Sequence, residues 1–324
     1  MTMNLTKINL ANTMMIGVIM TICANNWISM WMGIELSLLS FIPFIQNELK
    51  PSSESMIKYF IIQSIASTML LYSVIIMLVG ANMMNETLMM ISMLIKLGVA
   101  PFHNWVLMII NNINYLTMFT LLTIIKMPPL MVMYHINSEM LLIPILLSSI
   151  LGATSCMNQT SMKKTISYSS IFNLGLMLTS INKFNISVMF MLIYSMTMMM
   201  LIIISKKMKI NWINQMVFND FPIYMKINMW INMLSMGGFP PLMGFIMKML
   251  ILENLVFSNQ VMLTIIILMM SMLVMLFYTR LAFSCMMNSS LFKKWLMSSN
   301  KPLFFMISLN IMLTPLMLTS ISLI

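Results

Sequence analysis

The sequence predicts an all-α polytopic membrane protein. Of its 324 residues, 60% are hydrophobic and only 7% are charged, whereas soluble domains carry about 25% charged residues. The apolar residues fall into about eleven stretches, and each is close to the roughly 20 residues that a helix needs to cross a bilayer. The stretches do not alternate between polar and apolar residues. They are therefore helices that satisfy their own backbone in lipid, not strands of a transmembrane barrel.

The predicted spans follow one another with short loops, and no soluble domain fits between them. The chain, residues 1–324, is therefore expected to be a single membrane domain. The spans are predicted at 5–23, 26–46, 56–80, 87–111, 115–135, 139–157, 165–181, 186–205, 223–252, 258–284 and 302–322. Two longer connections, 206–222 and 285–301, carry lysine clusters.

The basic residues outside the spans are strongly biased to one side of the membrane. Of the 17 Lys and Arg residues, three lie deep within spans, which leaves 14. Only Lys183 falls on the side opposite the N-terminus. The other thirteen are Lys7, Lys50, Lys58, Lys163, Lys164, Lys206, Lys207, Lys209, Lys226, Arg280, Lys293, Lys294 and Lys301. The positive-inside rule then places the N-terminus on the matrix or cytoplasmic side and the C-terminus outside.

The composition also excludes several functions. The net charge of +10 could suggest nucleic acid, but the chain has one arginine, Arg280, and no basic patch interleaved with aromatic residues. Three cysteines lack metal-ligand spacing, and two histidines are too few for two bis-histidine haems. The 50 methionines could offer copper(I) soft ligands, but their even spread favours a role as core filler. Any redox chemistry is therefore expected on another subunit.

A short motif occurs twice, and it predicts an inverted repeat. Residues 93–101 and 233–241 both read ML-x3-G-x2-P, and they lie five spans apart, so the two copies enter the membrane from opposite sides. Because Gly and Pro interrupt the helical hydrogen bonds, both spans are expected to be discontinuous, unwound near 98–101 and 237–244. Repeat one covers about 5–135 and repeat two about 139–284. Broken helices at repeat-related positions indicate an ion pathway, although two short matches can also arise by chance.

Four ionisable side chains lie inside predicted spans: Glu35, Lys96, Lys126 and Lys248. A charge at membrane depth costs several kcal/mol unless it has a partner or water, so together they predict a proton relay. Each also has a structural explanation. Glu35 could be neutral beside a serine or a backbone group, and carbonyls freed by the break could hold Lys96. The two other lysines could extend toward the membrane surface.

A Glu35–Lys96 pair would couple charge movement to proton transfer. Burial disfavours the charged form of either group, whereas an opposite charge favours it. Pulling the pair apart would therefore favour proton transfer to a neighbour. His103 follows the first break and is either a further relay member or a helix-capping group. Tyr168, Ser169, Ser170 and Asn173 make the seventh span polar enough to hold water.

Several motifs together resemble the antiporter-like membrane subunits of respiratory complex I. They are Trp31-Met-Gly-Ile-Glu35, Lys58-Tyr-Phe, Lys96-Leu-Gly-Val-Ala-Pro-Phe-His103, Asn158-Gln-Thr, Tyr168-Ser-Ser-Ile, and Leu234-Ser-Met-Gly-Gly-Phe-Pro-Pro-Leu-Met-Gly-Phe-Ile-Met-Lys248. Their order and spacing are specific and cover about residues 27–280. The methionine usage is also similar to that of invertebrate mitochondrial genomes.

The resemblance implies two inverted five-helix repeats plus a C-terminal lateral helix at about 302–322. It implies that Glu35 pairs with Lys96, that Lys126 is the central connecting lysine, and that Lys248 belongs to the second broken helix. The short length favours a family member that has lost three N-terminal helices over the longer members. Asn173 stands where the family often has histidine, and an asparagine carries no proton, so water would have to bridge there. The family often has Trp-Gln before the central lysine, where this chain has Ile124 and Ile125.

The function implied is proton translocation in the mitochondrial inner membrane, coupled to electron transfer from NADH to quinone. No cofactor is expected on this chain. NADH, FMN, iron–sulfur clusters and ubiquinone would bind other subunits, and the partners would be other membrane-arm subunits, including other antiporter-like ones, and membrane lipids. Two alternatives are an independent cation/proton antiporter and a passive scaffold of the membrane arm, although a scaffold would not need buried lysines.

Overall fold

The computed structural model describes residues 5–46, 50–80, 85–136, 139–218, 223–286 and 314–315. Their regular structure is helical, apart from an isolated bridge between Ser161 and Trp212. The chain divides into two compact units, Met1–Ser148 and Ser149–Ile324. Within the described ranges, six helical segments are long and apolar enough to cross a membrane: Leu5–Cys23, Trp27–Ile45, Ser52–Val79, Tyr115–Tyr134, Phe184–Met208 and Val261–Met286.

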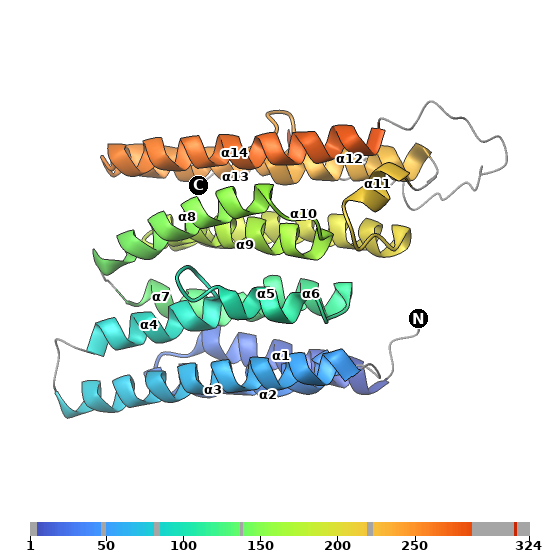
Figure 1. Cartoon of the computed structure of the whole chain (residues 1–324). Coiled ribbons are helices and arrows are strands. Elements are labelled where there is room, and N and C mark those ends of the chain that lie inside the picture. The colour runs from blue at the N-terminus through green and yellow to red at the C-terminus, as the bar shows by residue number, and fades with distance from the viewer. Residues whose placement is uncertain are drawn as a thin grey trace. The chain divides into compact units, whose positions relative to one another are not determined.

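The first unit contains long helices and several shorter helical segments (Figure 1). Its helices are α1 (Leu5–Cys23), α2 (Trp27–Ile45), α3 (Lys50–Val79), α4 (Asn85–Leu97), α5 (Asn104–Ile110), α6 (Tyr115–Leu122), the 3-10 turn η1 (Ile124–Lys126), α7 (Met127–Tyr134) and the 3-10 turn η2 (Glu139–Leu141). α1 packs on α2, and α3 packs on both α2 and α4. This arrangement places Glu35 on α2 in the same helical group as Lys96 on α4.

Small residues bring α1 and α2 together. A Cβ atom added at Gly17 would lie 2.8 Å from the Gly33 carbonyl oxygen and 2.8 Å from the Ser37 amide nitrogen. A Cβ atom at Gly33 would lie 2.9 Å from the Gly17 carbonyl oxygen. Close backbone approach through small residues is a common way for membrane helices to associate. The contact lies two residues from Glu35 and sets the position of that carboxyl group.

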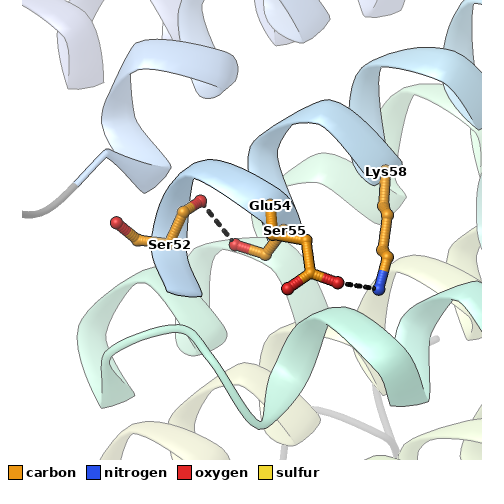
Figure 2. A network of polar contacts seen from close by, with 4 residues as sticks. All are labelled: Ser52, Glu54, Ser55 and Lys58. Atoms are coloured by element: carbon orange, nitrogen blue, oxygen red, sulfur yellow. Dashed lines mark hydrogen bonds and ion pairs between the residues drawn. The ribbon is translucent and has the colours of Figure 1, made fainter. Parts of the chain in front are cut away.

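The first turns of α3 are polar, which is why the predicted span at 56–80 began too late. Ser55 Oγ donates to the Ser52 carbonyl oxygen over 2.8 Å, and Lys58 Nζ pairs with Glu54 Oε1 at 2.5 Å (Figure 2). The Lys58 and Glu54 side chains are 41% and 60% exposed. An exposed i, i+4 pair adds only about 0.3–0.5 kcal/mol. This pair extends the helix beyond the apolar region without anchoring the fold.

The second unit holds the remaining helices, beginning within α8. They are α8 (Leu142–Met157), α9 (Met162–Thr179), α10 (Phe184–Met208), α11 (Asn214–Phe218), α12 (Ile223–Gly237), α13 (Met243–Phe257) and α14 (Val261–Met286). α12 packs against α10, α13 and α14, and α13 packs against α9 and α10. α9 is buried along most of its length. It therefore forms the interior of this unit beside the second interrupted helix.

Most of the predicted ranges fall on helices, but the structure differs from the prediction at two points. The fifth predicted span is interrupted at η1, and the 206–222 connection contains the short helix α11. The predicted C-terminal span at 302–322 lies outside the described residues, apart from Thr314 and Pro315. Lys293, Lys294 and Lys301 also lie outside them.

Candidate functional site

The first predicted helix break is present, and a glycine terminates the helix that precedes it. α4 ends at Leu97, and α5 begins at Asn104. Gly98 has φ +68, a left-handed conformation that glycine adopts without steric cost. Its amide donates to the Leu94 carbonyl oxygen over 3.0 Å, and the Val99 amide donates to the same oxygen over 3.2 Å. This is a glycine-terminated helix end that satisfies carbonyls otherwise left open.

At the second predicted break, a glycine terminates the preceding helix with a similar pattern of hydrogen bonds. α12 ends at Gly237, and α13 begins at Met243. Gly238 has φ +80, its amide donates to the Ser235 carbonyl oxygen over 3.1 Å, and the Phe239 amide donates to the Leu234 carbonyl oxygen over 3.1 Å. Gly238 and Leu234 occupy the motif positions that Gly98 and Leu94 occupy in the first copy. The repeated motif therefore encodes one local structure twice.

Two side chains from other helices donate hydrogen bonds to carbonyls at the first break. Trp105 Nε1, on α5, donates to the Ile95 carbonyl oxygen over 3.0 Å. Gln63 Nε2, on α3, donates to the Lys96 carbonyl oxygen over 3.4 Å. Trp105 and Gln63 are 7% and 3% exposed. They satisfy carbonyls at the end of α4 that would otherwise lack a donor in an apolar interior.

Glu35 and Lys96 face the same interior region but do not form a direct pair. Lys96, in the last turn of α4, is 3% exposed, whereas Glu35 is half-buried. The Glu35 carboxylate is close enough to act on the Lys96 charge. Nevertheless, Glu35 Oε2 and Lys96 Nζ are both buried and have no hydrogen-bond partner among the described residues. Glu35 and Lys96 thus lie near each other without a hydrogen bond between them.

Lys126 and His103 lie at irregular points of the first unit. Lys126, 3% exposed, ends the 3-10 turn η1 and caps the start of α7, where Pro128 follows. The turn packs against α1 and α6, and α7 packs against α4. His103 is half-buried at the N-cap of α5, where its side chain makes no capping hydrogen bond. Its side chain instead hydrogen-bonds to the backbone of Pro101, within the break.

Lys248, on α13, reaches back to the second break. Its Nζ donates to the Gly237 carbonyl oxygen over 2.6 Å and lies 5.8 Å from the centroid of the Phe172 ring. The side chain runs past Gly238, where an added Cβ would lie 2.8–2.9 Å from Nζ, Cε and Cδ. The ammonium group is thus held by a backbone carbonyl and an aromatic ring of the protein. A carbonyl at a helix C-terminus is a favourable partner for a cation.

Sequence reasoning missed several buried polar residues of the second unit. Asn228, Asn232 and Ser235 follow one face of α12, and each is 0% exposed. Asn232 Nδ2 donates to the Asn228 carbonyl oxygen over 2.8 Å and to its Oδ1 over 2.9 Å. Lys226, counted above with the loop charges, is 4% exposed in the first turns of α12. The i, i+4, i+7 spacing of the three uncharged residues was a signal that could have been found.

The described residues offer little to a metal ion. Within them, no three or more His, Cys, Asp or Glu side chains gather in a group that could hold one. Cys23 is exposed, Cys156 and Cys285 are buried, and all three are free thiols.

Comparisons with known proteins place this geometry in a family. The sequence profile described as "NADH:quinone oxidoreductase/Mrp antiporter, TM" matches residues 24–275. A chain of Aedes aegypti named NADH-ubiquinone oxidoreductase chain 2 is 36% identical over 310 residues, which are 91% of this chain and 91% of that one. A protein of the same name from Anopheles gambiae is 34% identical over 298 residues, which are 88% and 87% of the two chains.

Solved structures show the same fold at lower sequence identity. A chain of respiratory complex I from Thermus thermophilus matches with a TM-score of 0.77 at 18% identity, over 86% of this chain and 70% of that one. A chain of an archaeal membrane-bound sulfane sulfur reductase matches with a TM-score of 0.80 at 16% identity, over 94% and 71%. The family profile and the relatives above 30% identity agree: this chain belongs to the NADH-ubiquinone oxidoreductase chain 2 family, within the NADH:quinone oxidoreductase/Mrp antiporter membrane proteins.

Proposed function

We propose that this chain is the proton-translocating, antiporter-like chain 2 of mitochondrial NADH:ubiquinone oxidoreductase, and that Glu35, Lys96, Lys126 and Lys248 form its proton relay. His103 is a further relay member in this proposal. The observation that carries it is that Lys96 and the Lys248 ammonium group both lie at the C-terminal end of the first half of a broken helix. Ionisable residues at such breaks are the usual mark of an ion pathway.

The gap between Glu35 and Lys96 gives the relay a way to respond to charge. Their buried polar atoms have no hydrogen-bond partner among the described residues, although buried polar groups nearly always have a protein or water partner. Water in this gap would connect them. A shift that brings the opposite charges together favours the ammonium form of Lys96, and a shift that separates them favours release of its proton. Proton transfer then follows charge movement without a cofactor on this chain.

The proposal includes the finer architecture. The chain forms eleven transmembrane helices in two inverted five-helix repeats, about 5–135 and 139–284, with a lateral helix at about 302–322, all in one membrane domain. The similar glycine-terminated helix ends at Gly98 and Gly238 support the inverted repeat. The bias of basic residues supports an N-terminus in the matrix and a C-terminus in the intermembrane space.

The proposal assigns the redox chemistry to other subunits. NADH, FMN, iron–sulfur clusters and ubiquinone bind elsewhere in the complex, and the partners of this chain are other membrane-arm subunits, including further antiporter-like ones, and lipids. The name shared by the curated relatives supports this assembly. An independent cation/proton antiporter would instead purify without flavin and iron–sulfur subunits, so purification of the native protein separates the two.

The relay is tested by removing its charges in the assembled complex. We expect Lys96→Met and Glu35→Ala to lower proton pumping and coupled quinone reduction by roughly tenfold or more, equivalent to about 1.4 kcal/mol on the barrier, while the complex still assembles. The matched control is Lys207→Met, because Lys207 is exposed in the last turn of α10. Pumping in vesicles and assembly on native gels are measured. Wild-type pumping in both relay variants would support the scaffold alternative.

A further inference from the structure

Two connections of the second unit pair with each other at one end of its helices. The connection between α8 and α9 meets the connection between α10 and α11, and we call them the paired loops. Ser161 and Trp212 form an antiparallel bridge, and the Met162 amide donates to the Asn211 carbonyl oxygen over 2.9 Å. The Trp212 amide donates to Gln215 Oε1 over 3.2 Å. The paired loops are therefore held in one conformation by hydrogen bonds.

Lysines flank the paired loops on both sides. Lys163 and Lys164 lie in the first turn of α9 and are half-buried. Lys206 lies in the last turn of α10, and Lys209 is the C-cap of that helix; both side chains are exposed. Residues 140–219 contain no Asp or Glu. The positive charge around the paired loops is therefore not balanced by carboxylates from these segments.

Some of these lysines occupy positions that helix geometry does not favour. The N-terminal end of a helix attracts anions, yet Lys163 and Lys164 lie at the start of α9, where Ser161 makes no side-chain cap hydrogen bond. Lys209 has φ +52, a left-handed conformation that glycine usually supplies at a helix end. Backbone strain at a charged residue is an observation that indicates a function. An anion bound at the paired loops would offset the charge at the start of α9.

Trp212 indicates what kind of molecule carries that anion. Its side chain is 55% exposed, although the bridge fixes its backbone. Tryptophan is enriched where a membrane meets water, because its ring is apolar with one polar edge. α10 has 25 residues, more than the roughly 20 that cross a bilayer, so we expect its last turn to reach the lipid headgroups. The exposed indole and the lysines would then lie at headgroup level.

We propose that the paired loops bind the headgroup of an anionic phospholipid, with the flanking lysines around its phosphate and the Trp212 indole beside its acyl chains. Basic pockets between membrane helices are suited to such headgroups. An acidic segment of a partner protein would also satisfy the lysines, but an exposed indole at headgroup level favours the lipid. The site adds a lipid contact at a defined place on this chain and does not depend on the proton relay.

The test uses the intact complex in phosphatidylcholine nanodiscs that contain a photoactivatable anionic phospholipid. After illumination, peptide mass spectrometry measures the label on the paired loops. We expect the double variant Lys206→Gln/Lys209→Gly to lower this label by roughly tenfold. Lys183→Gln is the matched control, because Lys183 is exposed just before the first residue of the same helix, and it should label as wild type does.

The double variant also separates loss of charge from loss of structure. Glycine adopts the left-handed conformation of Lys209 without steric cost, so thermal unfolding of the double variant should occur at or above the wild-type temperature. Lower label together with an unchanged or higher unfolding temperature would show that the lysine charges bind the headgroup. An unfolding temperature below that of wild type would contradict the assignment of strain to Lys209.

The other outcomes would overturn the inference in distinguishable ways. Equal labelling by a zwitterionic photoactivatable lipid, or wild-type labelling of the double variant, would show that the lysines do not select an anionic headgroup. Displacement of the label by inorganic phosphate would assign the site to free phosphate. A crosslink from Lys209 to another subunit, with no lipid label in the wild-type complex, would assign the surface to a protein partner. Because pumping is not measured, failure of the relay would leave the lipid result unchanged.

Discussion

Gly238 is required for two independent physical reasons. Its φ of +80 is a left-handed conformation, which costs a residue with a side chain roughly 1–2 kcal/mol. In addition, the Lys248 side chain runs across the place where a Cβ would be, with three of its atoms 2.8–2.9 Å away. The glycine therefore closes the end of α12 and also leaves room for the lysine to reach the Gly237 carbonyl.

We predict that Gly238→Ala lowers coupled turnover, because the added methyl group displaces the Lys248 ammonium group from Gly237. Gly80→Ala is the matched control. Gly80 has φ +94 at the end of α3, and a Cβ there would meet nothing within 4 Å. Both variants should lose about 1–2 kcal/mol of stability from backbone strain, but only Gly238→Ala should lose turnover. Thermal unfolding and quinone reduction of the purified complex are measured. Equal turnover in the two variants would show that the position of Lys248 is unimportant.

For single residues, the sequence predicted which ionisable side chains are buried but not where each side chain points. Lys96 and Lys126 were predicted to lie inside the bundle from the apolar residues around them, and they are each 3% exposed. The sequence left open whether Lys248 extends to the surface, because the direction of a long side chain depends on which carbonyls lie nearby.

The broken helices show how an element can be irregular and still stable in an apolar interior. The end of α4 exposes carbonyls that need donors. The Gly98 and Val99 amides satisfy one, and Trp105 and Gln63 satisfy two more from other helices. The Lys96 side chain is then free to interact with charge, because the backbone around it is already satisfied.

We predict that Gln63→Leu destabilises the first unit by about 1–3 kcal/mol, because it leaves the Lys96 carbonyl buried without this donor. The change should also lower proton pumping per electron, since the end of α4 carries Lys96. Ser64→Ala is the matched control, because Ser64 follows Gln63 on the same helix, is only partly buried, and its hydroxyl bonds to the Ile61 carbonyl of that helix. Thermal unfolding and pumping stoichiometry are measured. A Gln63→Leu complex as stable and as well coupled as the Ser64→Ala complex would contradict the positioning role of Gln63.

Helix breaks were predictable from the sequence where glycine and proline occur together within a span. The glycines and prolines at 98–101 and 238–241 identified both interrupted spans, since these residues oppose helical hydrogen bonding. The interruption at η1 was missed, although Pro128 and Pro129 follow it, because prolines in the first turn of a helix are compatible with an unbroken span. The start of α3 and the short helix α11 were missed because their polar residues resemble loops.

On the scale of the whole molecule, the distribution of lysines along the chain gives information about membrane orientation that helix packing does not. α10 runs from Phe184 to Met208, with Lys183 before its first residue and Lys206 and Lys207 in its last turn. A helix of 25 residues is about 37 Å long at about 1.5 Å per residue, which exceeds the roughly 30 Å hydrocarbon core of a bilayer. We therefore expect the lysines at its two ends to lie on opposite sides of the membrane.

This geometry allows the orientation to be tested without changing the sequence. We predict that a membrane-impermeant amine reagent labels Lys183 in intact mitoplasts, where the intermembrane-space face is accessible, and labels Lys206, Lys207 and Lys209 in inverted inner-membrane vesicles. All four side chains are exposed, so their accessibility depends on the side of the membrane, and peptide mass spectrometry reports each separately. Detergent-solubilised complex, in which both faces are open, is the control. Labelling of Lys183 only in the inverted vesicles would reverse the orientation. Labelling of both ends from one side would mean that α10 does not cross the membrane.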